Sequence, residues 1–135
     1  MEGIEQYRHD AEQGNASAQY NLGYCYCKGI GVARNFAEAV KWFKKAAEQG
    51  HAEAQDYLGN CYYCNWGVEQ NFAEAAKWYK KAAEQGYAWA QYHYAHCLKS
   101  GMGVKRCTRE AVMWYKKAAE QGNEAAKEEL TQLGY

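Results

Sequence analysis

Small and apolar residues recur along residues 16–28 with the spacing of one helical face. The positions i, i+4, i+7 and i+8 are occupied by Ala18, Leu22, Cys25 and Tyr26. A period of this kind is typical of an amphipathic α-helix. Residues 36–48 show the same period, with lysines on the opposite side of an apolar face made of Ala39, Trp42, Phe43 and Ala46. We therefore predict helix A over 16–28 and helix B over 36–48.

Residues suited to helix ends stand on both sides of helix B. Asn35 and its later counterpart Asn71 are good N-caps, and each is followed three residues later by a glutamate that fits a capping box. Glycines follow each copy of helix B at Gly50, Gly86 and Gly122. In the loop between helices A and B, Asn65 replaces a glycine that opens the loop in the other copies. Asparagine tolerates the left-handed conformation that we expect there.

The helix pair is one unit of an internal repeat. The string Lys-Lys-Ala-Ala-Glu-Gln-Gly occurs at 44–50, 80–86 and 116–122, always 36 residues apart, and a degraded copy ends at Gly14. A fixed period of this length indicates a stack of helix pairs. We predict an all-α fold, a right-handed α/α solenoid, in a single repeat domain over 1–135. It comprises full repeats at 15–50, 51–86 and 87–122 between polar half-repeat caps at 1–14 and 123–135.

Invariant positions of the repeat are explained by packing. Alanines allow the helix axes to approach, and aromatic side chains fill the space between successive helix pairs. These aromatics are Trp42, Trp78, Trp114, Phe43, Tyr79 and Tyr115. We interpret this stripe as core and not as a cofactor site, and we expect no cofactor.

Composition narrows the classes of partner. Lys plus Arg and Asp plus Glu both number 16, so the formal net charge is zero. Binding to nucleic acid or to a membrane surface normally requires a basic face, and we expect neither. The first residues show no signal-peptide pattern, and no apolar stretch reaches the roughly 20 residues of a membrane span. We expect a cytoplasmic monomer.

The repeat resembles the Sel1-like repeat, a relative of the tetratricopeptide repeat. The resemblance rests on Ala-x-Ala-Gln-Tyr-Asn-Leu-Gly-x-x-Tyr at 16–26, Gly-x-Gly-Val at 29–32 and Ala-x-x-Trp-Phe-x-Lys-Ala-Ala-Glu-Gln-Gly at 39–50. It implies an adaptor that binds proteins or peptides and is not an enzyme. The disulfides of the cysteine-rich branch are not expected, because helix B ends in Ala-Ala here. The near-identity of the copies is typical of a consensus-based or engineered chain, or of recent duplication.

The copies differ mainly on one face of helix A. The variable positions are Ser17/Glu53/Trp89, Tyr20/Asp56/Tyr92, Asn21/Tyr57/His93, Tyr24/Asn60/His96 and Lys28/Cys64/Ser100. Many of them lie opposite the apolar face or at its border, which in such stacks is the concave side. Aromatic, His and Asn side chains suit protein recognition, whereas a merely solvated face would carry Lys and Glu. The candidate partner-binding residues are Tyr24, Tyr57, Asn60, Trp89, Tyr92, His93 and His96. Drift at an unimportant face is the alternative.

The loops between helices A and B carry an apolar residue next to a glycine. These residues are Ile30, Trp66 and Met102. We expect Ile30 and Met102 to pack onto the neighbouring repeat. Trp66 is larger, and it either packs in the same way or forms an exposed anchor for a partner, so it joins the candidate binding residues.

Cysteines and histidines raise the possibility of a zinc site or a disulfide, which the sequence supports only weakly. Cys25, Cys61 and Cys97 occupy one apolar helix A position, and we interpret them as buried small side chains. A zinc site of Cys27 with Cys64, or of His93 and His96 with Cys97, or a single disulfide is conceivable, but free thiols fit better because no Cys-x-x-Cys or His-Glu-x-x-His motif occurs. Neither a nucleophile elbow nor a phosphate loop is present. We expect no catalytic residues.

The sequence therefore predicts a non-catalytic module that binds a protein or peptide through the helix A face. A structural scaffold without a partner is the first alternative. A Cys/His metal-binding protein is the second.

Overall fold

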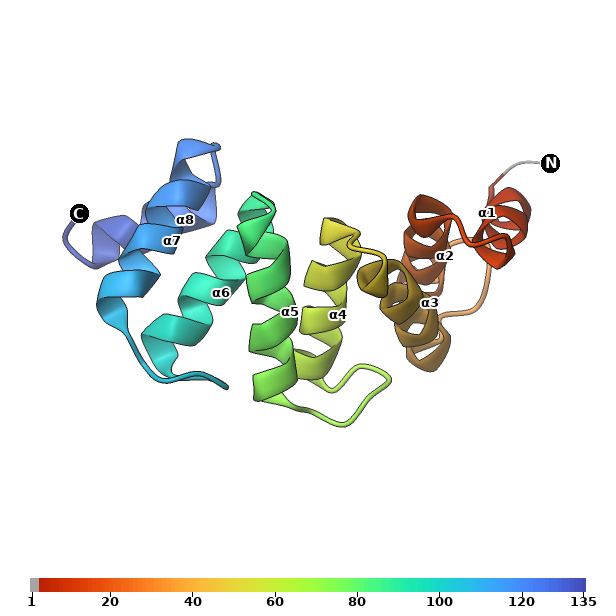
Figure 1. Ribbon diagram of the computed structural model, residues 1–135, viewed down its shortest axis with the longest axis horizontal. Helices are drawn as coiled ribbons and strands as arrows, with labels where there is room; N and C mark the ends of the chain where they lie inside the picture. The colour runs from red at the N-terminus through yellow and green to blue at the C-terminus, as the bar shows by residue number, and fades with distance from the viewer. Residues whose placement is uncertain (1–2) are drawn as a thin grey trace. The chain divides into compact units, whose positions relative to one another are not determined.

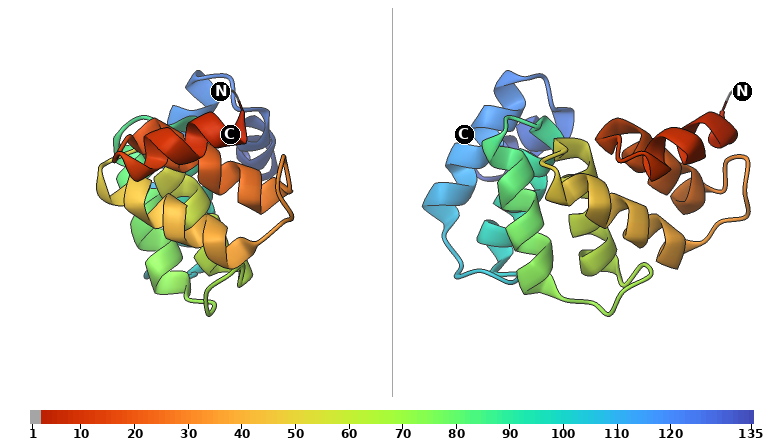
Figure 2. Two further views of the ribbon diagram at one scale, coloured as in Figure 1. Left: turned by 90° about the vertical axis from the view of Figure 1, so that its right-hand side faces the viewer. Right: turned by 45° about the vertical axis from the view of Figure 1, so that its right-hand side comes forward.

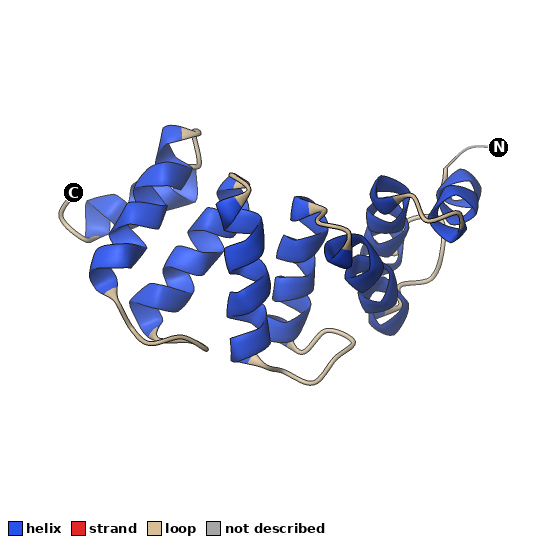
Figure 3. Cartoon of the chain, viewed as in Figure 1, coloured by secondary structure: helices blue, strands red, loops and turns tan. Residues whose placement is uncertain are grey.

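A computed structural model describes residues 3–135, and over that range the chain forms eight α-helices and no strand (Figures 1 and 3). The helices are α1 (Ile4–Glu12), α2 (Ala16–Lys28), α3 (Phe36–Glu48), α4 (Ala52–Cys64), α5 (Phe72–Glu84), α6 (Ala88–Ser100), α7 (Thr108–Glu120) and α8 (Glu124–Gln132). The all-α prediction and the predicted bounds of helices A and B are confirmed. The first two residues of the predicted N-terminal cap lie outside the described range.

The chain divides into two compact units, Met1–Gln70 and Asn71–Tyr135, which we call unit 1 and unit 2. Unit 1 contains α1 to α4 and unit 2 contains α5 to α8, and within each unit successive helices pack against one another. In unit 2 the short α5–α6 turn and the longer α6–α7 loop lie at opposite ends of the helices (Figures 1 and 2). In unit 2, α5, α6 and α7 thus run in alternating directions.

The predicted N-caps of α3 and α5 are confirmed, but the capping box predicted before α3 does not form, because the Asn35 N–H donates to the Tyr26 carbonyl at 2.9 Å. The side chains of Asn35 and Asn71 accept hydrogen bonds from the backbone N–H of Glu38 and Glu74, at 3.1 and 3.0 Å. Gly50, Gly86 and Gly122 follow their helices with φ of 91°, 94° and 92°. Asn65 ends α4 with φ 59°, as expected for an asparagine in place of glycine. The equivalent of Asn35 before α7 is Cys107, whose side chain makes no capping hydrogen bond.

The aromatic core lies where the invariant positions predict it, with one exception. Trp42 and Trp78 are buried, and two lysines lie over each indole at 5.1 to 5.3 Å from the ring centroid. Trp114 is only half-buried, contrary to the expectation of a fully packed core. Met113 takes the place of one covering lysine there, and its side chain is 54% exposed. Trp114 thus lacks one of the two lysines that lie over Trp42 and Trp78.

Glutamine side chains connect successive repeats in a way that the periodicity did not reveal. In unit 1 the amide of Gln19 donates to the Ala11 carbonyl at 3.1 Å, while Gln49 donates to the Gly14 carbonyl and to the Gln19 side chain at 3.0 and 2.8 Å. Unit 2 repeats the arrangement with Gln91, Ala83, Gln121 and Gly86. The helix A glutamines Gln19 and Gln91 therefore satisfy buried backbone carbonyls, and the heptapeptide glutamines Gln49 and Gln121 tie them to the turn of the preceding repeat.

The apolar loop residues behave differently in the two loops of unit 1. Trp66 is half-buried and its ring stacks on Phe36, with centroids 5.5 Å apart and planes 9° apart. Ile30 is 50% exposed, so the prediction that it packs onto the neighbouring repeat is wrong. Trp66 packs on Phe36, the first residue of α3. The helix that takes the place of α3 beside Ile30 is α1, which begins only at Ile4, the position equivalent to Val40, so that among the described residues no ring equivalent to Phe36 lies beneath Ile30. Met102, in unit 2, is half-buried.

Candidate functional site

In unit 1 the variable helix A residues form a cluster of aromatic rings. Tyr24 of α2 meets Tyr57 of α4 edge to face, with centroids 5.8 Å apart. Tyr20 lies 5.9 Å from Tyr57, and Phe43 of α3 stacks on Tyr57 at 5.3 Å. We call Tyr20, Tyr24, Phe43 and Tyr57 the unit 1 cluster. Phe43 is fully buried and the three tyrosines are half-buried, so the cluster rests on the core and reaches the surface.

Burial also sets the chemistry of this cluster. Desolvation, with smaller contributions from Tyr24 and Cys27, raises the pKa of Tyr57 to about 12. The phenol therefore stays neutral in the physiological range and is available as a hydrogen-bond donor. Asn60 lies one turn further along α4 and is half-buried. Asp56, another variable position, is buried at 3% exposure, so the expectation of a border or outward position is wrong for this residue.

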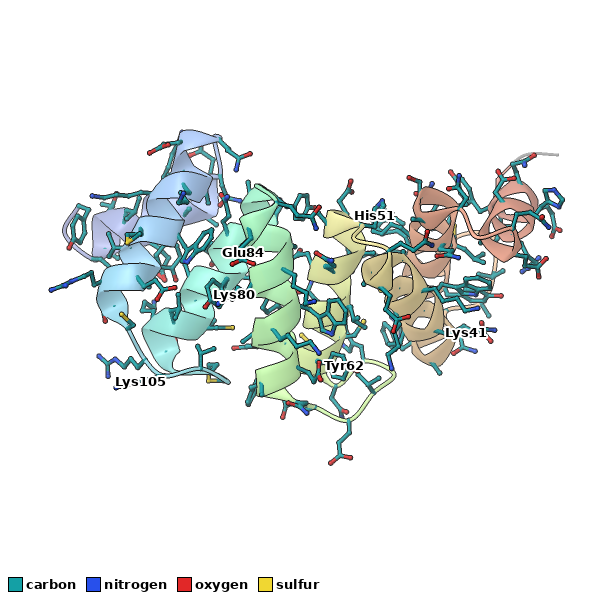
Figure 4. The ribbon with its side chains drawn as sticks, in the orientation of Figure 1. Lys41, His51, Tyr62, Lys80, Glu84 and Lys105 are labelled. Atoms are coloured by element: carbon teal, nitrogen blue, oxygen red, sulfur yellow. The ribbon has the colours of Figure 1, made fainter. Side chains whose placement is uncertain are left out.

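His51 adjoins the cluster at the first turn of α4, where Figure 4 labels it. Its ring stacks on Tyr20 with centroids 4.9 Å apart and planes 24° apart. Its Nδ1 accepts a hydrogen bond from the backbone N–H of Ala54 at 3.1 Å. The sequence analysis missed this residue, although its N-cap position could have been read from the equivalent Asn15 and Asn123.

Unit 2 carries a second aromatic cluster on α6. Trp89 stacks on His93 with centroids 5.9 Å apart and meets Tyr92 nearly perpendicularly at 5.8 Å. Tyr79 of α5 lies 4.9 Å from His93, and Tyr115 of α7 lies 5.8 Å from Tyr92. We call these five residues the unit 2 cluster. Trp89 is 48% exposed and is its most accessible member, since Tyr92 and His93 are half-buried.

Polar groups flank the unit 2 cluster. Lys99 of α6 forms an ion pair with Glu129 of α8 at 2.7 Å. Burial, together with Lys99 and His93, lowers the pKa of the half-buried His96, and Glu129 opposes this shift. His96 is therefore largely uncharged at neutral pH. The fully buried Tyr115 hydroxyl has no hydrogen-bond partner among the described residues.

The predicted binding residues thus fall into separate groups. Tyr24 and Tyr57 touch each other in unit 1, and Trp89, Tyr92 and His93 touch one another in unit 2. Trp66 belongs to neither cluster, because its ring lies against Phe36. Tyr20 was among the variable positions but not among the candidates. Its ring nevertheless contacts four others: Tyr24, Phe43, His51 and Tyr57.

The cysteines at the repeated helix A position are structural in character. Cys25, Cys61 and Cys97 are buried as predicted, and burial raises the pKa of Cys61 and of Cys97 to about 12. Thiols of this kind are unreactive. All six cysteines are free, with Cys27 buried and Cys64 exposed. In the part of the chain that the structure describes, no three His, Cys, Asp or Glu side chains are grouped as a metal ion requires.

The helices were also compared with the dimensions of a bilayer. No helix within residues 3–135 combines the length and hydrophobicity needed to cross one.

Comparison with known proteins supports the repeat assignment. The Sel1 repeat family model matches residues 16–51, 52–87 and 90–123. A Sel1 repeat protein from Oxalobacter formigenes is 45% identical with a TM-score of 0.81, and the match covers 84% of this chain and 47% of that one. A protective antigen of uropathogenic Escherichia coli strains, which displays an SLR fold, is 40% identical with a TM-score of 0.88, covering 93% of this chain and 27% of that one. The chain thus spans about half the length of the first protein and about a quarter of the second.

A more distant similarity extends over nearly a whole protein. Cysteine-rich protein B of Helicobacter pylori is 22% identical with a TM-score of 0.71, and the match covers 91% of this chain and 88% of that one. At this identity the likeness concerns the fold alone. None of the curated proteins matches the chain. Sel1 repeats are typically a non-catalytic fold that mediates protein–protein interactions.

Proposed function

Because the chain belongs to the Sel1 repeat family, we propose that it is a non-catalytic module that binds a protein or peptide through the variable faces of its A helices, with the Trp66 loop at the edge of this surface. The binding residues are Tyr24, Tyr57 and Asn60 in unit 1, and Trp89, Tyr92, His93 and His96 in unit 2. The proposal concerns a single repeat array over 1–135 that acts as a monomer in the cytoplasm.

The observation that carries this proposal is the contrast between the two kinds of helix face. The outward faces of α3 and α5 carry exposed lysines and glutamates, as a solvated surface does. The variable faces of the A helices instead carry aromatic rings in mutual contact, including Trp89 with about half of its side chain exposed. Rings held by their neighbours lose little rotamer entropy on binding, which favours their use as anchors.

The electrostatics favour an uncharged partner surface. Tyr57 and His96 are neutral near pH 7, and Lys99 is already paired with Glu129. The formal net charge of zero argues against nucleic acid. We therefore expect apolar and hydrogen-bonding side chains in the partner. Trp66 has a packing role against Phe36, so we assign it a smaller part, at the edge of the surface.

The test is a peptide selection followed by matched substitutions in unit 2. Peptides would be selected by display on the purified protein, and affinities measured by calorimetry for wild type, Trp89→Ala and Met113→Ala. Both residues are exposed and apolar, at 48% and 54%, but Met113 lies on α7, a B helix. We expect Trp89→Ala to weaken binding roughly 30-fold or more, as hot-spot residues do, and Met113→Ala to change it less than about twofold. Equal effects, or loss only with Met113→Ala, would contradict the proposal.

A scaffold without a partner is the alternative, and the equivalent glutamine bonding in the two units, which serves packing alone, favours it. That alternative predicts that selection yields no peptide whose binding depends on Tyr57 or Trp89. A metal-binding protein would instead contain stoichiometric zinc on elemental analysis and lose it on Cys64→Ser or His96→Ala.

A further inference from the structure

One helix A is capped by a side chain that can take up a proton. Asn15 and Asn123 cap α2 and α8 by accepting from the N–H of Ala18 and Ala126 at 2.8 and 2.9 Å. The same position before α4 is His51, whose Nδ1 accepts from Ala54 at 3.1 Å. Amide side chains do not take up a proton between about pH 5 and pH 8. His51 therefore makes the same N-cap hydrogen bond as the asparagines, but with a group that titrates.

The hydrogen bond requires one particular form of the imidazole. Nδ1 can accept only when it carries no proton, which places the proton of the neutral ring on Nε2. Protonation would convert Nδ1 into a donor facing another donor, the Ala54 N–H. It would also place a positive charge at the N-terminus of α4, where the helix dipole disfavours cations. Both effects oppose protonation in the folded state.

The surroundings of His51 come from three helices of unit 1. From α2 the titratable group that faces the ring is Tyr20, which stacks on it. The end of α3 contributes the Ala46 carbonyl, which accepts from the His51 backbone N–H at 3.1 Å. On α4 the carboxylate of Glu53 favours protonation, but burial acts more strongly and lowers the pKa of His51 below its ordinary value of 6.5.

We propose that His51 is a pH-sensitive N-cap that ties the first turn of α4 to the unit 1 cluster. A single ring connects the cap to the cluster. Tyr20 stacks on His51 and also contacts Tyr24 and Tyr57. Loss of the cap loosens the start of α4 and the Tyr20 stack together, and Tyr57 lies only two turns from the cap. The consequence for partner binding rests on the proposed function, whereas the loss of the cap does not.

The direction of the pH effect follows from the lowered pKa. Above pH 6.5 both folded and unfolded chains carry a neutral His51, and the stabilisation is fully present. As the pH falls below 6.5 the unfolded chain takes up a proton first, so the folded state loses stability until the pH reaches the lower folded pKa. His96 shifts in the same direction, so its contribution must be separated from that of His51.

The first experiment compares wild type, His51→Asn and His96→Asn by thermal unfolding between about pH 8 and about pH 5. Asparagine at 51 restores the cap found at the equivalent positions but removes the titration. We expect the Tm of wild type to fall about 4 °C further than that of His51→Asn over this range. In His96→Asn the decrease in Tm that is due to His51 should remain. Identical pH profiles of wild type and His51→Asn would overturn the proposal.

The second experiment follows single residues by NMR without any partner. In wild type the Ala54 amide and the Tyr57 ring resonances should titrate together with a midpoint below 6.5, and both should be insensitive to pH in His51→Asn. An Ala54 amide that does not titrate would overturn the cap. A titrating Ala54 with an unchanged Tyr57 would overturn the connection to the unit 1 cluster. Neither result depends on whether the proposed binding function is correct.

Discussion

The equivalent helices α3 and α7 share the Lys-Lys-Ala-Ala-Glu segment, yet they differ at three places that matter for stability. Before α3, Asn35 forms a cap, whereas Cys107 before α7 forms none. Within α3, Phe43 fills the buried ring position that Tyr115 fills in α7 with a hydroxyl lacking a partner among the described residues. In addition, two lysines lie over Trp42, whereas within residues 3–135 Lys117 is the only one over Trp114. The repeated segment thus gives α3 and α7 the same helical backbone, but the contacts that support this helix are weaker in α7.

The largest expected effect concerns the two indoles. Trp42→Ala should lower the free energy of unfolding by about 3–5 kcal/mol, because it removes a buried ring and leaves a cavity. Trp114→Ala should cost about 1–2 kcal/mol less, since Trp114 is already partly exposed. Urea denaturation of both variants measures the difference. If both variants lose the same free energy of unfolding, the difference in packing between α3 and α7 does not affect stability.

A smaller effect is expected at the start of α7. Cys107→Asn should raise the free energy of unfolding by about 1 kcal/mol, because it supplies the hydrogen-bond acceptor that Asn35 and Asn71 provide before α3 and α5. Cys107→Ala is the matched control, because it removes the thiol without adding an acceptor. Thermal unfolding of the two variants is the measurement, and a gain shared by both would point to the loss of the thiol instead.

The smallest effect is expected at the buried ring of α7. Tyr115→Phe should leave stability unchanged or raise it by about 0.5 kcal/mol, because it removes an unpaired hydroxyl and restores the residue found at Phe43. Denaturation of this variant beside wild type is sufficient. A clear loss of stability would mean that the hydroxyl binds a buried water molecule.

Much of the fold could be predicted because it depends on local patterns. The apolar period, the Asn35 cap and the glycine after each helix B act within a few residues of one another, and they place the bounds of α2 and α3 correctly. The glutamine bonds could not be predicted in this way. Gln49 reaches Gly14 across 35 residues, and no period within one helix shows which carbonyl lies opposite.

The candidate site was less predictable for the same reason. Ile30 and Trp66 occupy equivalent positions, but only Trp66 has an aromatic ring beneath it, so burial depends on the neighbour and not on the residue. The inward position of Asp56 depends in the same way on how α4 is rotated about its axis. Helical spacing placed Tyr24 and Tyr57 on one face of each A helix. Their mutual contact required the packing of α2, α3 and α4.

The glutamine bonds also have a consequence for how such a chain can grow. The amides of Gln49 and Gln121 each reach a carbonyl 35 residues earlier, at Gly14 and Gly86. A duplicated block of 36 residues would therefore arrive with its own donors and find its acceptors already in place. Gene duplication could lengthen the array one block at a time, and no junction would have to evolve afresh.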